Sequence, residues 1–229
     1  MNQKDNSSIE KRVYDLIRAA ILQRKLTPGM KISALSLSQE IGVSRTPVRL
    51  ALQQLSAEGF VVMNSNKAAH VAKPSAENIK EVFFMRKVLE SKAAELACQK
   101  NNQHGLKKLR KLAELEGKYF NARDLAQYTT ANEAFHLQIA KMAKNELLYE
   151  AIEKYLTQSS IVLSLFEPFY DFSKADEIKY LEENEVLIAY IEKGDEKKAS
   201  AEMKRHIQQS LNNLSLEKLD ELTSLVPRL

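Results

Sequence analysis

The chain has 229 residues, 44% of them hydrophobic, with six glycines, five prolines, a net charge of +4 and one cysteine, Cys98. This composition favours helices over a sandwich or barrel, allows a buried core, and excludes a disulfide framework or a thiolate metal cluster. No apolar run reaches membrane-spanning length and no signal-peptide pattern opens the chain, so we expect a cytoplasmic protein that contacts no membrane.

Charge is divided unevenly along the chain. Residues 1–75 hold eleven Lys and Arg against five Asp and Glu, whereas residues 76–229 hold 23 against 25. A basic first third beside a near-neutral remainder is typical of a region that meets a polyanion, although a split of this size also arises by chance.

The first predicted element is a helix that begins at an N-cap, Ser7 or Ser8, and carries apolar side chains at helical spacing. The Leu-Thr-Pro-Gly segment at 26–29 ends this helix region. A short second helix is expected at about 34–41, and Gly42 ends it as a C-terminal glycine does.

A third helix is expected from the N-cap Ser44 to about Glu58, where a glycine follows. Two short apolar runs, at 60–63 and 69–71, then surround the polar turn 64–67. This pattern predicts a β-hairpin.

A domain boundary is expected at Lys73-Pro74-Ser75, which divides the chain into domains 1–74 and 75–229. Beyond it the periodicity indicates only helices. They are expected at about 75–100, 104–119, 122–143, 145–166, 174–193 and 195–213, with a last amphipathic piece at 215–225.

The two short helices joined by Gly42 and Val43 form a helix-turn-helix pattern. The polar face of the later helix carries Arg45, Thr46, Arg49 and Gln53. Arginine can donate two hydrogen bonds to one guanine, and threonine can bond bases or phosphates. The hairpin would form a wing with Lys67 near the phosphates. From periodicity alone, a solvated basic face remains an equally good interpretation.

The segments LTPG at 26–29, LSQEIGVSRTPVR at 37–49 and ALQQLSAEGFV at 51–61 resemble the GntR family of bacterial transcription regulators. The helical second domain is similar to the FadR/FCD branch of that family. The resemblance implies a mainly α protein with an N-terminal winged helix-turn-helix, a small β-hairpin wing and an all-α effector-binding and dimerisation domain. It also implies a homodimer that represses transcription from a palindromic operator until a small organic acid or sugar acid binds. The operator-contacting positions of the family match Ser44, Arg45, Thr46 and Arg49.

Three positions depart from the family pattern. Leu50 stands where the family commonly has Glu, Ala68 where the wing tip commonly has Gly, and Leu35 where a charged DNA contact is frequent. The operator sequence therefore cannot be carried over from relatives.

Five polar side chains interrupt apolar faces in the second domain: Arg86, Asn132, His136, Asn184 and His206. Burying a polar group without a partner costs a few kcal/mol, so we expect the five to meet one another, water or a ligand in a polar cavity. One inward histidine is more often an ordinary core residue, and the interpretation therefore depends on the set. Their donors suit a carboxylate effector.

The FCD family often builds a metal site here from one Asp and three His, with the first pair written D-x-x-F-H. In this chain the pair is Asn132 and His136, and the remaining positions match Asn184 and His206. Amide oxygens bind divalent transition metals poorly, whereas two imidazoles retain some affinity. Zinc or nickel on His136 and His206 is therefore the alternative to a metal-free carboxylate site.

No nucleophile elbow, phosphate loop or H-E-x-x-H motif occurs, so we expect no enzymatic activity. Three other interpretations stay open. The same cavity could make the protein a metal-responsive regulator, or the effector response could have been lost. The third interpretation is a metal-dependent enzyme. It is disfavoured because Asn132 stands where the metal site would need an acidic ligand.

Overall fold

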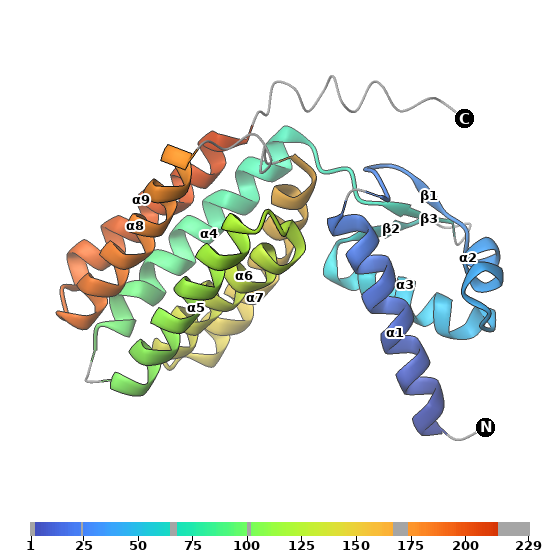
Figure 1. Cartoon of the computed structure of the whole chain (residues 1–229), viewed down its shortest axis with the longest axis horizontal. Coiled ribbons are helices and arrows are strands. Elements are labelled where there is room, and N and C mark those ends of the chain that lie inside the picture. Colours follow the sequence, from blue (N-terminus) through green and yellow to red (C-terminus); the bar gives the residue numbers. More distant parts are fainter. Residues whose placement is uncertain (1–2, 24, 65–67, 100–101, 167–173, 215–229) are drawn as a thin grey trace. The chain divides into compact units, whose positions relative to one another are not determined.

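The computed structural model of the chain describes residues 3–23, 25–64, 68–99, 102–166 and 174–214. Within them the chain forms two compact units, the first ending at Ser75 and the second beginning at Ala76. Helices dominate both (Figure 1), which confirms the mainly α fold. No helix in the described ranges is both long and apolar enough to cross a bilayer.

The first unit combines three helices with a small sheet in its described part. Its elements are α1 (Gln3–Leu22), β1 (Lys31–Ile32), α2 (Ala34–Ile41), α3 (Arg45–Glu58), β2 (Val61–Met63) and β3 (Ala69–Val71). The strands are antiparallel in the order β1-β3-β2, and His70 of β3 lies opposite Lys31 on one side and Val62 on the other. The predicted hairpin is therefore confirmed as β2 and β3.

The core of this unit forms where α1 packs on α3. Val13, Ile17 and Ile21 of α1 and Val48 and Leu55 of α3 are buried. On both helices the buried residues recur three or four positions apart, as expected for one apolar face. Packing of these faces holds α3 in place, so its opposite face is free to carry function.

Two expectations for this unit were wrong or incomplete. Helix α1 begins at Gln3, so Ser7 and Ser8 lie inside it and neither is its N-cap. The polar residues before Ser7 extend the helix although they add nothing to its apolar stripe. Strand β1 was not predicted, because two residues are too short to show an alternating pattern. The wing residue Lys67 and the tail from 215 lie outside the described residues.

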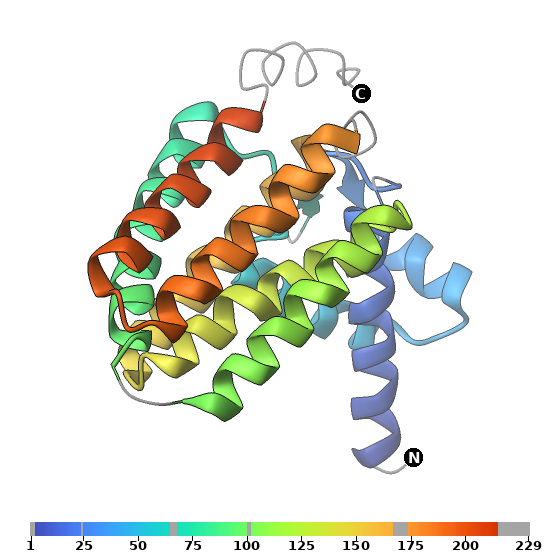
Figure 2. The same cartoon turned by 60° about the vertical axis from the view of Figure 1, so that its left-hand side comes forward.

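The second unit is a helical bundle in its described part (Figure 2). Its helices are α4 (Ala76–Ala97), α5 (Gln103–Asn121), α6 (Leu125–Met142), α7 (Glu146–Phe166), α8 (Lys174–Glu192) and α9 (Glu196–Asn213). Helix α4 packs against α6, α7 and α9, and α5 packs against α6 and α8. All six helices agree with the sequence prediction to within a few residues.

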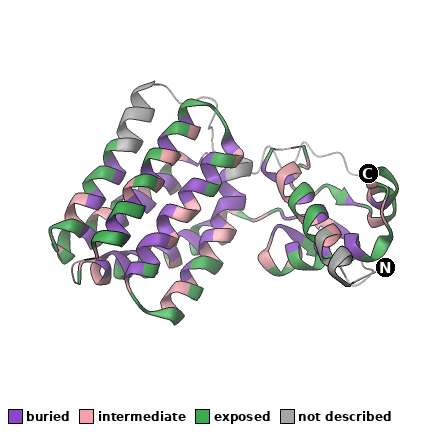
Figure 3. Cartoon of the chain, turned by 60° about the horizontal axis from the view of Figure 1, so that its bottom comes forward, coloured by how far each residue is buried: buried purple, intermediate pink, exposed green. Residues whose placement is uncertain are grey.

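Polar side chains cap the first turns of three of these helices. The side-chain oxygens of Asn102, Asp124 and Asp195 accept hydrogen bonds from the first turns of α5, α6 and α9. Such caps satisfy backbone N–H groups that have no partner within the helix. Buried residues follow the helix sides that face one another within the bundle (Figure 3), so its centre is enclosed by several helices.

Candidate functional site

A sharp turn connects α2 to α3. Ser33 caps α2, and its hydroxyl oxygen accepts a hydrogen bond from the Ser36 N–H at 3.2 Å. Gly42 ends α2 with a φ of 72°, a left-handed conformation that glycine adopts at little cost. Its N–H donates to the Ser38 carbonyl, and Ser44 is the N-cap of α3 two residues later. The local sequence therefore builds a compact helix-turn-helix.

The start of α3 presents polar side chains to solvent. Arg45, Thr46 and Arg49 are exposed, whereas Val48 is completely buried. Neither arginine forms an ion pair with another described residue. Ser44 is also exposed, and its side chain makes no capping hydrogen bond. The structure thus brings four of the five predicted contact residues to one exposed end of α3, where their donors can meet a polyanion.

Two apolar residues accompany this polar surface. Leu50 on α3 is 42% exposed and Leu35 in the first turn of α2 is 45% exposed. These are two of the positions that depart from the family pattern. Both side chains lie on the surface, so a different residue at either position changes the surface of this unit and not the packing of its core.

A second cluster of functional candidates lies inside the bundle. The five side chains predicted to face a polar cavity are all buried, between 2% and 9% exposed. They come from four helices and are Arg86, Asn132, His136, Asn184 and His206. The structure adds three buried carboxylates that the sequence prediction missed, Glu90, Glu116 and Glu183. We call these eight residues together the buried polar cluster.

Arg86 is held by partners on α4 and α7. Its Nε donates to Glu90 Oε1 at 2.6 Å, and its Nη1 donates to the Ser159 hydroxyl at 3.0 Å. On the other side of Glu90, Oε2 lies 2.5 Å from His136 Nδ1. Glu90 therefore joins a guanidinium on its own helix to an imidazole on α6.

Glu116 of α5 occupies the space between the two asparagines. Asn132 Nδ2 donates to its Oε1 at 2.9 Å, and Asn184 Nδ2 donates to its Oε2 at 3.0 Å. The Oδ1 atom of Asn184 is buried and has no hydrogen-bond partner among the described residues. Both amides thus present their N–H groups to one carboxylate.

His206 of α9 completes the cluster. Its Nδ1 lies 3.2 Å from Glu183 Oε2, and Arg205 Nη1 donates to Glu183 Oε1 at 2.9 Å. The rings of His206 and His136 are 5.3 Å apart between centroids. Each imidazole therefore has a carboxylate at Nδ1, the arrangement that leaves Nε2 to face another group.

Burial and charge set the protonation of this cluster. Burial raises the pKa of Glu90, but the charges of Arg86 and His136 outweigh it and hold that pKa at about 2. Burial lowers the pKa of His136 to about 4, although Glu90 opposes the shift. At neutral pH Glu90 is therefore ionised and His136 is neutral.

The other two carboxylates shift in opposite directions. Burial raises the pKa of Glu116, and the hydrogen bonds from Asn132 and Asn184 only partly offset it. Burial raises the pKa of Glu183, but the hydrogen bonds from His206 and Arg205 outweigh this effect and lower that pKa. Glu116 is thus the cluster's most readily protonated carboxylate.

Sequence reasoning missed Glu90, Glu116 and Glu183, although a signal exists for each. Glu90 follows Arg86 by four residues, the spacing of a helical ion pair. Glu116 lies on the face of α5 that buries Leu109, Ala113 and Phe120. Glu183 directly precedes Asn184. An acidic residue on an otherwise apolar helix face therefore indicates a buried polar site in the same way as a histidine does.

The cluster does not fit the metal site that the family resemblance implies. A transition-metal site needs three or four ligands that point their lone pairs at one centre. Asn132 and Asn184 instead point N–H donors at Glu116. Among the described residues no three His, Cys, Asp or Glu side chains are arranged to hold a metal ion. His136 and His206 alone do not make such a site.

Comparisons with known proteins agree with this architecture. The model of the "Bacterial regulatory proteins, gntR family" matches residues 9–71, and that of the "FCD domain" matches residues 81–209. The second match alone covers more than half of the chain. The two matches correspond to the two units of the structure.

Curated relatives are transcription regulators by name. The chain is 30% identical over 125 residues to the Nta operon transcriptional regulator of Aminobacter aminovorans, an alignment that covers 55% of this chain and 59% of that protein. It is 28% identical over 203 residues to the HTH-type transcriptional regulator LutR of Bacillus subtilis, covering 80% of this chain and 90% of LutR. The first alignment thus spans less than two thirds of the relative.

A solved structure shares the fold. The chain matches E. coli McbR/YncC with a TM-score of 0.74 at 21% identity, over 94% of this chain and 98% of that one. At this identity the likeness concerns the fold alone. On the two family matches, the chain belongs to the gntR family of bacterial regulatory proteins, a family of transcription regulators and not of enzymes, and it carries an FCD domain.

Proposed function

We propose that the protein acts as a homodimeric repressor that binds a palindromic operator and releases it when a small acid binds the helical domain. Residues 1–74 form the DNA-binding domain and residues 75–229 the effector-binding and dimerisation domain. The observation that carries the first part is the exposed end of α3, where Arg45, Thr46 and Arg49 lie on the face opposite the buried core.

The exposed end of α3 suits the major groove of DNA. A recognition helix enters that groove with its first turns, where arginine can bond guanine O6 and N7 together. We assign Arg45, Thr46 and Arg49 to base or phosphate contacts, Ser44 to a phosphate, and Lys67 of the wing to the adjacent backbone. Two copies of α3 would read half-sites about 34 Å apart.

The buried polar cluster is the candidate effector site. We assign Arg86, Asn132, His136, Asn184 and His206 to effector binding. Arg86 and the two amides donate to Glu90 and Glu116 in this structure, so a bound acid would take over hydrogen bonds that these glutamates now accept. A hydroxylated acid, such as a sugar acid, offers hydroxyl donors as well as a carboxylate, so its groups suit both the donors and the acceptors of this cluster. Such a ligand weakens operator binding only if it binds more tightly to the conformation of the protein that has low affinity for DNA.

Selection of duplexes from a random pool tests the DNA-binding proposal. We expect the protein to enrich a two-fold symmetric sequence, and a gel-shift titration to give an affinity that falls with salt as phosphate contacts are screened. Failure to retain any duplex above background would overturn the proposal.

Thermal-shift screening tests the effector proposal. A ligand that binds the folded state raises the melting temperature, and we expect sugar acids or hydroxy acids to do so while they lower operator affinity. The Asn184→Leu variant removes one donor from the cluster and should abolish that shift while operator affinity stays near wild type. An identical shift in wild type and variant would place the ligand elsewhere.

A further inference from the structure

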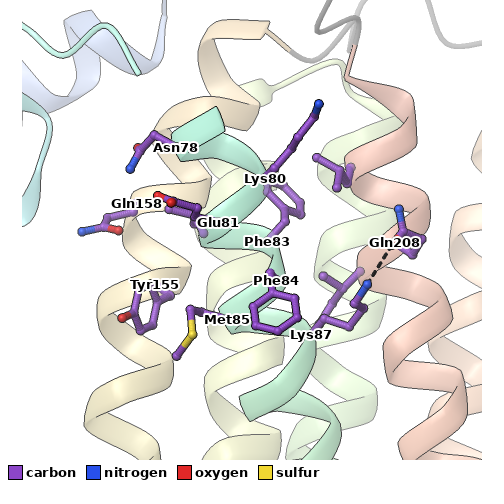
Figure 4. Close-up of a pocket in the computed structure, with 13 residues that line it drawn as sticks. Asn78, Lys80, Glu81, Phe83, Phe84, Met85, Lys87, Tyr155, Gln158 and Gln208 are labelled. Atoms are coloured by element: carbon purple, nitrogen blue, oxygen red, sulfur yellow. Dashed lines mark hydrogen bonds between the residues drawn. The ribbon is translucent and has the colours of Figure 1, made fainter. Parts of the chain in front are cut away.

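Exposed apolar side chains occur on both units of the protein. On the second unit, Phe84 of α4 is 59% exposed and lines a groove of about 670 Å³ between α4, α7 and α9 (Figure 4). An apolar hollow of this kind is typical of a contact with another protein. On the first unit, Leu35 of α2 and Leu50 of α3 are exposed on the helix-turn-helix itself. These two leucines are therefore candidates for contact with DNA.

Leu50 lies on the outward face of α3, beside the residues assigned to the operator. It follows Thr46 by four residues, which places it one turn later and about 40° around the helix axis. Arg49 lies about 60° from Thr46 in the opposite direction around the axis. Thr46 therefore stands between a guanidinium and an isobutyl group, and the three side chains share one surface.

The neighbours of Leu50 say more than its exposure. Single leucines are common on protein surfaces, so exposure alone does not identify a contact. When the first turns of α3 enter the major groove, however, a side chain between Thr46 and the later turns is brought against the base edges. Leu50 must then cover whatever group the DNA presents at that point.

The major groove offers one apolar group to such a side chain. Every base presents hydrogen-bond donors or acceptors there, and thymine alone adds a C5-methyl group. Covering an amino or carbonyl group with leucine removes its water without giving it a new hydrogen bond, which is unfavourable. Covering a methyl group is favourable, because two apolar surfaces leave water together. A leucine at this place therefore distinguishes thymine from the other bases.

We infer that Leu50 is a specificity-determining residue that contacts the methyl group of one thymine in each half-site of the operator. This inference rests on the proposed function, in which α3 enters the major groove. It adds an apolar contact to the polar contacts assigned to Arg45, Thr46 and Arg49. Each half-site accordingly carries an A·T pair that the protein recognises by its methyl group.

Leu35 provides a matched comparison. It is 45% exposed and Leu50 is 42% exposed, and both belong to the same helix-turn-helix. In this motif the first helix crosses the DNA backbone, whereas the second lies in the major groove. Phosphates and sugars carry no methyl group, so we expect Leu35 of α2 to make no contribution to the recognition of thymine.

The test removes methyl groups from the DNA. The probe is a duplex that the full-length protein has selected from a random pool, with deoxyuridine in place of thymidine at symmetric positions of the two half-sites. Uracil pairs as thymine does and lacks only the methyl group. In gel-shift titrations we expect one such pair of positions to raise the dissociation constant on the order of tenfold, because each protein copy loses one methyl contact.

Variants of the protein assign this effect to one side chain. Leu50→Ala should bind the thymine and uracil duplexes equally well, because alanine is too short to reach the methyl group. Leu50→Met should keep the discrimination, and so should Leu35→Ala. Both leucines are exposed and alanine favours a helix, so the melting temperature of each alanine variant should stay near that of wild type.

The outcomes separate this inference from the proposed function. If no deoxyuridine substitution weakens binding, or if the weakening persists in Leu50→Ala, the role of Leu50 is wrong while the regulator proposal stands, since a duplex has still been selected. Loss of the discrimination in Leu35→Ala but not in Leu50→Ala would move the contact to α2 and also overturn the inference. If the pool yields no duplex above background, the regulator proposal fails and the inference fails with it.

Discussion

Glu90 and His136 lie side by side in the centre of the bundle, with 2.5 Å between Oε2 and Nδ1 and neither side chain more than 2% exposed. Because Arg86 bonds the other carboxylate oxygen, one glutamate satisfies two neighbours from two helices. Glu90 is therefore the residue on which this part of the core depends.

Replacing Glu90 by glutamine should destabilise the protein strongly. The variant keeps the volume but leaves the Arg86 guanidinium in the interior without a counter-charge, which costs about 3 to 5 kcal/mol. Urea unfolding followed by circular dichroism measures the loss. The surface pair of Arg110 and Glu192, joined at 2.8 Å, is the control, and Glu192→Gln should cost less than about 1 kcal/mol. Equal losses in the two variants would show that the buried pair has no special role.

Stability should fall as the pH drops from 7 to 5. Burial lowers the pKa of His136 from 6.5 to about 4, so in this range the unfolded chain binds a proton that the folded chain does not. Below pH 4.5 Glu90 acts with the same sign, because its folded-state pKa is about 2. We expect His136→Gln to reduce the slope of unfolding free energy against pH between 7 and 5. Parallel curves for variant and wild type would contradict the assignment of that slope to His136.

Arg45→Ala and Arg49→Ala should each weaken operator binding by roughly 1–3 kcal/mol, the free energy of a bidentate contact with a base. Both side chains are exposed, so the melting temperature should change little. A gel-shift titration on the selected operator measures the effect, with Arg110→Ala on α5 as a control for the loss of one positive charge. Unchanged affinity in both α3 variants would reject the proposed docking of α3.

Metal content gives a further test of the buried polar cluster. Because the two amides point N–H groups at Glu116, we expect protein purified without a histidine tag to hold no stoichiometric zinc or nickel. Asn132→Asp together with Asn184→His places one acid and three imidazoles at these positions and should bind about one zinc per chain. Elemental analysis after dialysis checks both. Stoichiometric metal in wild type would overturn our interpretation of the cluster.

The helices of this protein are largely predictable from sequence because their apolar positions recur over many turns. The bounds expected for α4 to α9 agree with the structure to within a few residues. Strand β1 could not be found this way, since Lys31 and Ile32 pair with β3 only after the chain has folded. At the start of α1 the apolar stripe marks the buried face and not the end of the helix.

The buried polar cluster was predictable only in part. The inward positions of Asn132, His136 and Asn184 follow from the period of their own helices, which is local information. Their partner Glu116 comes from another helix, and no local pattern tells which helices will meet. The orientation of the two amides, which decides against a metal, depends on that long-range contact and was beyond prediction.

Helix α4 carries Phe84 on its outer side and Arg86 on its inner side, only two residues apart. Because both belong to one continuous helix, a ligand that shifted α4 through Arg86 or Glu90 would also displace the exposed side chains of Phe84 and Val88. A shift of α4 in the interior of the bundle would thereby change the position of side chains on its outer surface, with no other residue needed to transmit it.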